Sequence, residues 1–301
     1  MMAAALLACD WGSTNLRAWT FDADGHDVAR RDFDLGVNRL APGEAGQRFL
    51  DEVRPALKAD TLPALLCGSI GSNIGWTPVP YVDCPADLPA IAAGFASPVE
   101  NIWIAPGLRC EGLSPAGDVL RGEETQAFGW IAGAPERADG RWLVCQPGTH
   151  AKWLVIEDGR IVRFLSAFTG ELFAVLSAHS ILRSDGKVHD ETAFMEGLEA
   201  AAEGDGLLNR IYSARARVAG RGADQASTGS YLSGLLIGAE VAATPRLLGM
   251  EDERVVLLGA PALCARYETA LARRKVSTCL ADGDEAVKTG LLALAKMRGL
   301  I

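Results

Sequence analysis

Residues near the N-terminus combine a carboxylate with a polar turn in a way that suits phosphate and metal chemistry. An apolar run from residue 6 ends at Asp10, and a second apolar run follows from residue 16. The turn between them offers backbone N–H groups, two hydroxyls and one amide, from Gly12, Ser13, Thr14 and Asn15. Glycine lets a ligand approach the main chain closely, and such turns can hold phosphate. Asp10 cannot bind phosphate itself, but it can hold hydrated Mg²⁺ that bridges to a nucleotide.

Taken alone, this segment fits an ordinary hairpin with a solvated aspartate at least as well as it fits a phosphate-binding hairpin. The same turn chemistry returns, however, between two further expected strands, at Gly148, Thr149 and His150. Two such turns on facing domains could hold a phosphate chain from both sides. The imidazole of His150 could donate to a nucleotide oxygen or could simply be satisfied by the backbone, and the sequence leaves both readings open.

Two other glycine-containing segments are candidates for ligand contacts. The loop over residues 68–76 follows an expected buried strand, and ligands of α/β sheets bind beyond the carboxyl ends of strands. Gly71 and Ser72 could therefore form a sugar-binding wall, although glycine loops after strands are common for turn geometry alone. Gly259 ends another expected strand, where it could lie beneath an adenine or merely terminate the strand.

The elements that must position these residues alternate between strands and helices, which predicts α/β layers. A strand, a polar turn and a second strand occur at residues 9–19 and again at 145–153, which indicates a weak internal repeat. Strands are expected at 6–9, 16–21, 62–67, 102–105, 142–145, 153–157, 160–166 and 254–258. Helices are expected at 44–57, 123–132, 231–243 and 284–297 and over much of 171–217.

Composition narrows the class of protein and its partners. Of the 301 residues, 49% are hydrophobic and 22% are charged, and a chain of this length can form two hydrophobic cores. A net charge of −9, without basic runs interleaved with aromatics, argues against nucleic acid as a partner. No apolar stretch approaches the ~20 residues that span a bilayer, and the apolar start lacks a basic region, so neither a membrane partner nor a signal peptide is expected. Seven scattered cysteines without a CxxC pair favour free thiols in a cytoplasmic protein. The sequence leaves the oligomeric state open, and a homodimer is one possibility.

Four segments occur in an order typical of one superfamily. Residues 10–17, 121–129, 147–150 and 255–259 resemble the first phosphate hairpin, catalytic helix, second phosphate turn and adenosine-binding glycine of sugar kinases among the actin-like ATPases. Over nearly the whole chain, the sequence resembles the 2-dehydro-3-deoxygalactonokinase family. The segments that carry this resemblance are residues 10–19, 68–72, 80–85, 121–126, 147–153 and 169–173.

The resemblance implies an α/β, two-domain actin-like ATPase (ribonuclease H-like) fold with a central nucleotide cleft. It implies an N-terminal domain over residues 1–112, a C-terminal domain over 113–283, and a last helix over 284–301 that packs back on the first domain. The implied reaction transfers the γ-phosphoryl group of ATP, with Mg²⁺, to the 6-hydroxyl of 2-dehydro-3-deoxygalactonate. The 6-phosphate is then ready for aldol cleavage in galactonate catabolism.

The resemblance also assigns roles to charged residues. Glu123 aligns with the catalytic base of the glycerol and pentulose kinases, which have aspartate at this position, and Glu124 is a second candidate for the role. A carboxylate within reach can accept the proton that the attacking hydroxyl loses. Independently of the resemblance, the residue types themselves supply cations suited to an anionic sugar acid at Arg17, Arg121 and Lys152, and either arginine could hold its carboxylate. A surface salt bridge is an equally good account of either arginine taken singly.

The alternatives belong to the same fold, and the first is a kinase for a related sugar acid. An exopolyphosphatase-type phosphohydrolase also has a Gly-Glu-Glu helix start, in which a glutamate activates water. A sugar-sensing regulator would normally carry a DNA-binding helix-turn-helix, but the first hairpin begins at residue 6 and leaves no room for one in front.

Overall fold

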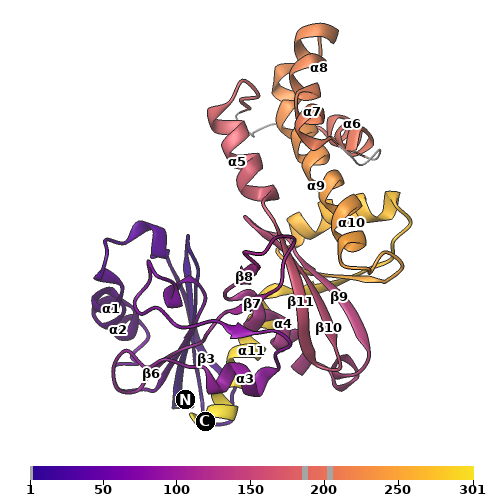
Figure 1. The fold of residues 1–301 in the computed structure, drawn as a ribbon. Coiled ribbons are helices and arrows are strands. Elements are labelled where there is room, and N and C mark those ends of the chain that lie inside the picture. The colour runs from indigo at the N-terminus through magenta and orange to yellow at the C-terminus, as the bar shows by residue number, and fades with distance from the viewer. Residues whose placement is uncertain (1–2, 185–188, 202–205) are drawn as a thin grey trace. The chain divides into compact units, whose positions relative to one another are not determined.

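The computed structural model describes residues 3–184, 189–201 and 206–301 (Figure 1). The chain divides into two compact units, which are described separately below. Unit 1 contains Met1–Arg141, Ile156–Arg163 and Asp282–Ile301, and unit 2 contains Trp142–Val155 and Phe164–Ala281.

Unit 1 is built on a five-stranded sheet with the order β3–β2–β1–β4–β6. The first three strands form antiparallel pairs, whereas β4 runs parallel to both β1 and β6. Its strands are β1 (Leu6–Trp11), β2 (Leu16–Phe21), β3 (Asp27–Phe33), β4 (Ala64–Cys67) and β6 (Ile102–Ile104).

The central strand β1 is buried on both faces of this sheet, as its almost unbroken apolar sequence requires. Side chains alternate between the faces, and Leu7, Cys9 and Trp11 share one hydrophobic cluster with Phe49 and Val53. The last two residues belong to a helical segment made of α1 (Glu44–Arg48), a π-helical turn (Phe49–Val53) and α2 (Arg54–Ala56). This segment matches the helix predicted over residues 44–57.

The remaining elements of unit 1 are a small sheet and three helices, one of which begins with Glu123 and Glu124. A three-stranded sheet has the order β5–β7–β8 and consists of β5 (Val82–Asp83), β7 (Leu108–Cys110) and β8 (Asp118–Leu120). The helices are α3 (Leu88–Ala93), α4 (Glu123–Ala132) and α11 (Gly283–Arg298). Helix α11 packs against α4, α3 and β1, which ties the end of the chain into unit 1.

The second five-stranded sheet repeats the strand arrangement of the first. Most of its residues belong to unit 2, whereas Arg141, Ile156–Arg163 and Asp282 are grouped with unit 1. The sheet has the order β11–β10–β9–β12–β13, so that in both sheets the first strand in chain order lies between the second and the fourth. This shared order is the structural form of the repeat that the two turns indicated. The strands are β9 (Arg141–Gln146), β10 (Ala151–Glu157), β11 (Arg160–Ala167), β12 (Val255–Gly259) and β13 (Thr278–Asp282).

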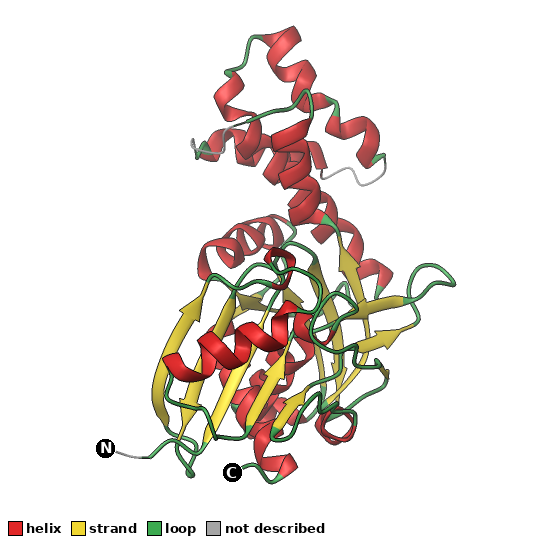
Figure 2. Cartoon of the chain, turned by 90° about the vertical axis from the view of Figure 1, so that its left-hand side faces the viewer, coloured by secondary structure: helices red, strands yellow, loops and turns green. Residues whose placement is uncertain are grey.

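The described residues between β11 and β12 form helices and no strands (Figures 1 and 2). Helix α9 is at the centre of this group and packs against α5, α6, α7, α8 and α10. The helices are α5 (Thr169–His179), α6 (Glu191–Ala201), α7 (Leu207–Ile211), α8 (Ser213–Arg221), α9 (Thr228–Leu247) and, after β12, α10 (Pro261–Arg273). Among the described residues, no helix combines the length and the apolar character needed to cross a bilayer.

The division into units places residues 113–141 with the N-terminal elements, whereas the sequence suggested a boundary after residue 112. The reason is packing, because α4 lies against α11 within unit 1. The assignment of residues 1–112 and 113–283 to functional domains stays a prediction.

Candidate functional site

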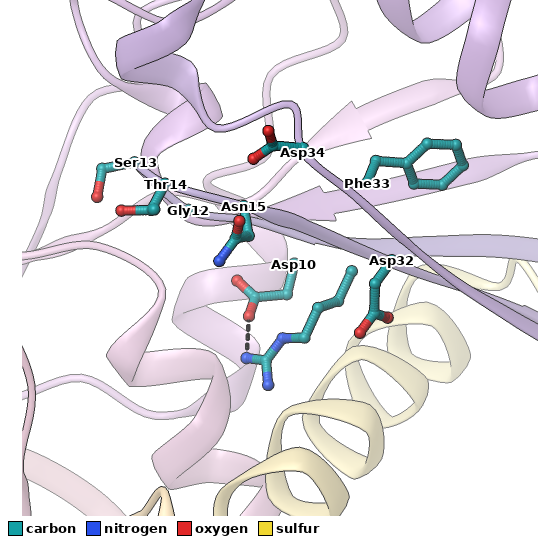
Figure 3. Close-up of a pocket in the computed structure, with 9 residues that line it drawn as sticks. Asp10, Gly12, Ser13, Thr14, Asn15, Asp32, Phe33 and Asp34 are labelled. Atoms are coloured by element: carbon teal, nitrogen blue, oxygen red, sulfur yellow. Dashed lines mark hydrogen bonds and ion pairs between the residues drawn. The ribbon is translucent and has the colours of Figure 1, made fainter.

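A pocket of about 600 Å³ opens at the end of the first hairpin (Figure 3). Figure 3 shows the carboxylate of Asp10 and the amide of Asn15 directed into it. Its lining contains every hairpin residue that the sequence singled out, namely Asp10, Gly12, Ser13, Thr14, Asn15 and Arg17. Three further residues complete the lining: Asp32, Phe33 and Asp34. The volume and the mixture of hydroxyl, amide, backbone and carboxylate groups suit a polar ligand.

The shape of the turn is fixed by main-chain hydrogen bonds. The N–H of Gly12 donates to the carbonyl of Asn15 at 3.0 Å and closes the hairpin. From the other side, the N–H groups of Val37 and Asn38 donate to the carbonyls of Gly12 and Ser13 at 3.1 and 3.0 Å. These bonds occupy carbonyls of the turn, so it is held in place without using its hydroxyls or its side-chain amide.

The carboxylate of Asp10 belongs to a charged network. Asp10 lies opposite Arg17 in the β1–β2 register, and the Arg17 guanidinium forms ion pairs with Asp10 and with Asp284 on α11. Asp284 is also 3.1 Å from Arg30 on β3. Arg17 therefore has two carboxylate partners within the protein.

A buried thiol connects Asp10 with the start of α4. Cys67, at the end of β4, has its Sγ 3.9 Å from Oδ1 of Asp10. Burial, and then the charges of Asp10 and Glu124, raise the pKa of this thiol. Asp10 and Glu124, more than 110 residues apart in the sequence, therefore both act electrostatically on the same thiol.

The two glutamates that begin α4 have different environments. Glu123 is half-buried, and its Oε2 accepts the N–H of Arg121 at 3.0 Å. Glu124 is 0% exposed, and its two oxygens accept the N–H of Gly122 at 2.6 Å and the hydroxyl of Thr125 at 2.9 Å. Glu123 is therefore partly accessible, whereas Glu124 is enclosed.

Burial raises the pKa of Glu124 from its ordinary value of 4.5 to about 7, and the charge of Glu123 adds to the shift. Because the folded state holds this proton more tightly than the unfolded state, stability should fall as pH rises from 4.5 to 7. Glu124→Gln removes the titration. We expect the free energy of unfolding of wild type, relative to this variant, to drop by about 3 kcal/mol across that range.

Urea unfolding of both proteins between pH 4 and 8 measures this difference. Glu136→Gln, at an exposed glutamate, is the matched control and should show no such trend. A constant difference between wild type and Glu124→Gln across the range would show that Glu124 titrates normally.

Arg121 lies beside the loop proposed as a sugar-binding wall. Its guanidinium stacks on Tyr81 at 4.4 Å from the ring centroid, and Nη2 donates to the carbonyl of Val79 at 2.6 Å. Nε and Nη1 are buried and have no hydrogen-bond partner among the described residues, and the same holds for the hydroxyl of Ser72. A Cβ on Gly71 would lie only 2.8 Å from Nη1, so glycine leaves room at this nitrogen.

The second turn, in unit 2, is backed by the start of α5. The N–H of Glu171 donates to the carbonyl of Thr149 at 2.8 Å, and its Oε2 lies 2.5 Å from Nε2 of His150. The His150 ring also stacks on Phe168, with the ring centroids 5.1 Å apart. Thr149 and His150 are nevertheless exposed, which a ligand contact requires.

Two further residues of unit 2 were singled out by the sequence. Lys152 is buried on β10, where Nζ donates to the hydroxyl of Ser166 at 2.7 Å. Gly259, at the end of β12, lies near the second turn, because a Cβ there would be 3.6 Å from the carbonyl oxygen of Pro147. Lys152 therefore has an internal partner, whereas Gly259 borders the turn.

Sequence reasoning missed several residues of these sites. Asp32, Phe33 and Asp34 line the pocket from β3 and the segment after it, and Asp284 pairs with Arg17 from the last helix. Asp32 lies opposite Arg17 in the β2–β3 register, but this register becomes visible only in the structure, because the sequence does not mark β3 as a strand.

Comparison with known proteins places the chain in a family. The 2-keto-3-deoxy-galactonokinase family model matches residues 10–294, nearly the whole chain. The chain belongs to this family. It is 34% identical over 296 residues to the 2-dehydro-3-deoxygalactonokinase of Escherichia coli K12, with 98% of each chain covered.

Solved structures agree with this assignment. A protein from Sinorhizobium meliloti, provisionally described as a 2-dehydro-3-deoxygalactonokinase, has a TM-score of 0.85 at 33% identity and covers 97% of this chain and 98% of its own. The activator of 2-hydroxyisocaproyl-CoA dehydratase from Clostridium difficile, solved with ADPNP, has a TM-score of 0.50 at 14% identity and covers 99% and 96%. The second likeness concerns the fold alone. The predicted family membership, the actin-like kinase fold and the assignment to the transferases are confirmed.

Proposed function

We propose that this chain transfers the γ-phosphoryl group of ATP to the 6-hydroxyl of 2-dehydro-3-deoxygalactonate. The observation that carries the choice of substrate is the half-buried side chain of Arg121, whose Nε and Nη1 are buried beside Gly71 and have no hydrogen-bond partner in the described part of the chain. A cation with buried spare donors suits an anionic group, and the family's named substrate is an acid. The product would be the 6-phosphate that enters aldol cleavage in galactonate catabolism. The seven cysteines are scattered along the chain without a CxxC pair, which favours a cytoplasmic reaction.

The nucleotide phosphates, in this proposal, contact the two polar turns. Gly12, Ser13, Thr14 and Asn15 line the pocket of unit 1, and the exposed Thr149 and His150 follow Gly148 in unit 2. Gly259 borders the second turn and is proposed for the adenosine side. The N–H of Gly12 closes the hairpin, whereas the hydroxyls and side-chain amide of the first turn and the polar groups of the second turn are suitable donors for phosphate oxygens.

The oxygen ligands that Mg²⁺ prefers are present in the same pocket. The carboxylate of Asp10 is partly exposed there, next to the hydroxyls of the turn. We propose that Asp10 holds the metal through its waters. Bound Mg²⁺ would neutralise charge on the transferred phosphoryl group.

Glu123 is the proposed general base. Geometry decides before pKa in such an assignment, because the base must reach the hydroxyl whose proton it accepts. Glu123 is partly accessible, whereas Glu124 is fully enclosed with both oxygens occupied. We propose that Glu124 shapes the start of α4 through its bonds to Gly122 and Thr125.

Arg121, rather than Arg17, is the proposed partner of the substrate carboxylate, because Arg17 already pairs with Asp10 and Asp284. Arg121→Leu should raise KM for the keto acid by about 10- to 1,000-fold, equivalent to ~1.4–4 kcal/mol, with little change in KM for ATP. Steady-state kinetics with each substrate varied in turn measure this split.

The matched control is Arg109→Leu. Arg109 lies on β7, which pairs with the strand β8 directly before Arg121, and its exposed side chain pairs with Asp83. Its KM for the keto acid should stay at the wild-type value. A neutral analogue without the carboxylate should be a poor substrate for wild type and lose little more in Arg121→Leu. If Arg121→Leu keeps the wild-type KM, or if a neutral ketose is the better substrate, the sugar-acid assignment is wrong.

A coupled assay of ADP release tests the reaction class. The panel contains both C4 epimers of the keto acid, aldonates, neutral ketoses and no acceptor. Release of ADP that depends on the keto acid is expected, whereas release of phosphate without any acceptor would indicate a hydrolase of the exopolyphosphatase type.

A further inference from the structure

A buried carboxylate on α9 gathers three hydrogen-bond donors in unit 2. Glu240 is 6% exposed. Its Oε1 accepts the indole N–H of Trp153 at 2.6 Å, and its Oε2 accepts the hydroxyl of Tyr267 at 2.8 Å and that of Thr169. Burying an ionised carboxylate is costly unless donors satisfy it, so this arrangement needs its three donors.

The three donors come from three elements near the second turn. Trp153 is on β10, the strand that leaves the turn. Thr169 is the first residue of α5, and Tyr267 is on α10, the helix that follows Gly259. Glu240 therefore joins three elements that are far apart in the sequence, and two of them, β10 and α5, begin at or beside the segment over residues 147–150.

Thr169 is the donor with a direct route to the turn. The next residue, Gly170, lies so close that a Cβ on it would be 2.4 Å from the carbonyl oxygen of Gly148 and 2.9 Å from Cα of Thr149. The following residue, Glu171, binds the Thr149 carbonyl and the His150 ring. A shift of Thr169 would therefore move the segment that backs the turn.

We propose that Glu240 is a positioning residue for the second turn and acts on it through Thr169. The proposal rests on the proposed function, in which this turn contacts the nucleotide phosphates. The hydrogen-bond donors that the described residues offer to Glu240 lie outside the turn, on Trp153, Thr169 and Tyr267. Glu240 fixes the start of α5 relative to β10, and residues 169–171 transmit that position to Gly148, Thr149 and His150 by close packing and hydrogen bonds.

The test compares two variants that each remove one hydroxyl donor from the same carboxylate. Thr169→Val removes the donor that leads to the turn, and Tyr267→Phe removes the donor on α10. Each should lower the free energy of unfolding by a similar amount. Only Thr169→Val should weaken binding of a non-hydrolysable ATP analogue with Mg²⁺. We expect a loss of about tenfold, because binding must then impose a turn position that one strong hydrogen bond fixes in wild type, and such a bond contributes a free energy of that size.

Isothermal titration measures Kd for the analogue, and urea unfolding measures stability. Thr169→Ser keeps the hydroxyl and should restore the wild-type Kd. KM for the keto acid should be unchanged in all three variants. The proposal is overturned if Thr169→Val binds the analogue as wild type does, or if Tyr267→Phe weakens binding equally, since a general loss of stability would then explain both.

His150→Ala separates this inference from the proposed function. If it leaves Kd for the analogue unchanged and Thr169→Val does too, the turn does not contact nucleotide and both ideas fail. If His150→Ala weakens binding and Thr169→Val does not, the turn is a nucleotide site and only the role of Glu240 is wrong.

Discussion

Glu123→Gln should lower kcat by about 10²-fold or more while leaving the Kd of ATP nearly unchanged, because it removes proton acceptance and almost no volume. The amide can still accept the N–H of Arg121, so the start of α4 should keep its conformation. Rapid-quench measurement of the first turnover, with the analogue's Kd alongside, separates the chemical step from binding.

Glu124→Gln is the matched variant one residue later, and its effect on kcat should be much milder. Both oxygens of Glu124 are bonded within the protein, to Gly122 and Thr125, and an amide can preserve most of this arrangement. If Glu124→Gln abolishes turnover and Glu123→Gln does not, the base is Glu124 and the helix start opens on substrate binding.

Asp10→Asn should reduce turnover by at least about 10²-fold and raise the Mg²⁺ concentration needed for half-maximal rate, because metal binding contributes several kcal/mol to phosphoryl transfer. Asparagine keeps the shape of the side chain but loses the charge that attracts the metal. Tm should change little, since Arg17 keeps Asp284 as a partner. Titration of Mg²⁺ at saturating ATP and keto acid measures the effect.

Asp284→Asn is the control for the charged network. It removes the other partner of Arg17 and leaves the Asp10 carboxylate in place. Its half-saturating Mg²⁺ concentration should stay close to that of wild type. An Asp10→Asn enzyme with the wild-type rate and Mg²⁺ dependence would reduce Asp10 to a turn residue.

The first hairpin could be predicted from the sequence because its strands are apolar and its turn residues are distinctive. The third strand could not. The β3 sequence DVARRDF has exposed side chains at six of its seven positions, so no alternation of hydrophobic residues marks it. Asp32, Phe33 and Asp34 were missed as pocket residues for this reason. Strand β5, with two residues, was too short to give any pattern.

Local sequence signals predicted the start and length of α4, but they could not predict contacts between residues far apart in the sequence. Acidic residues directly after Gly122 mark the start of α4, and the helix spans the expected residues 123–132. Nothing local indicated that Asp284 pairs with Arg17, 267 residues earlier, or that Glu240 binds Trp153 and Thr169. Such partners are set by the tertiary fold. The same holds for the two arginines, since the sequence could not reveal that Arg17 has internal partners while Arg121 has spare donors.

The most direct test of the central claim is analysis of the product by phosphorus and carbon NMR. Wild-type protein, ATP, Mg²⁺ and 2-dehydro-3-deoxygalactonate are incubated together, and phosphate esters, ADP and inorganic phosphate are quantified. We predict one ester, on the 6-hydroxyl, formed in equal amount to ADP and absent without the keto acid. Inorganic phosphate formed from ATP without an acceptor, or an ester at another hydroxyl, would contradict the proposed function.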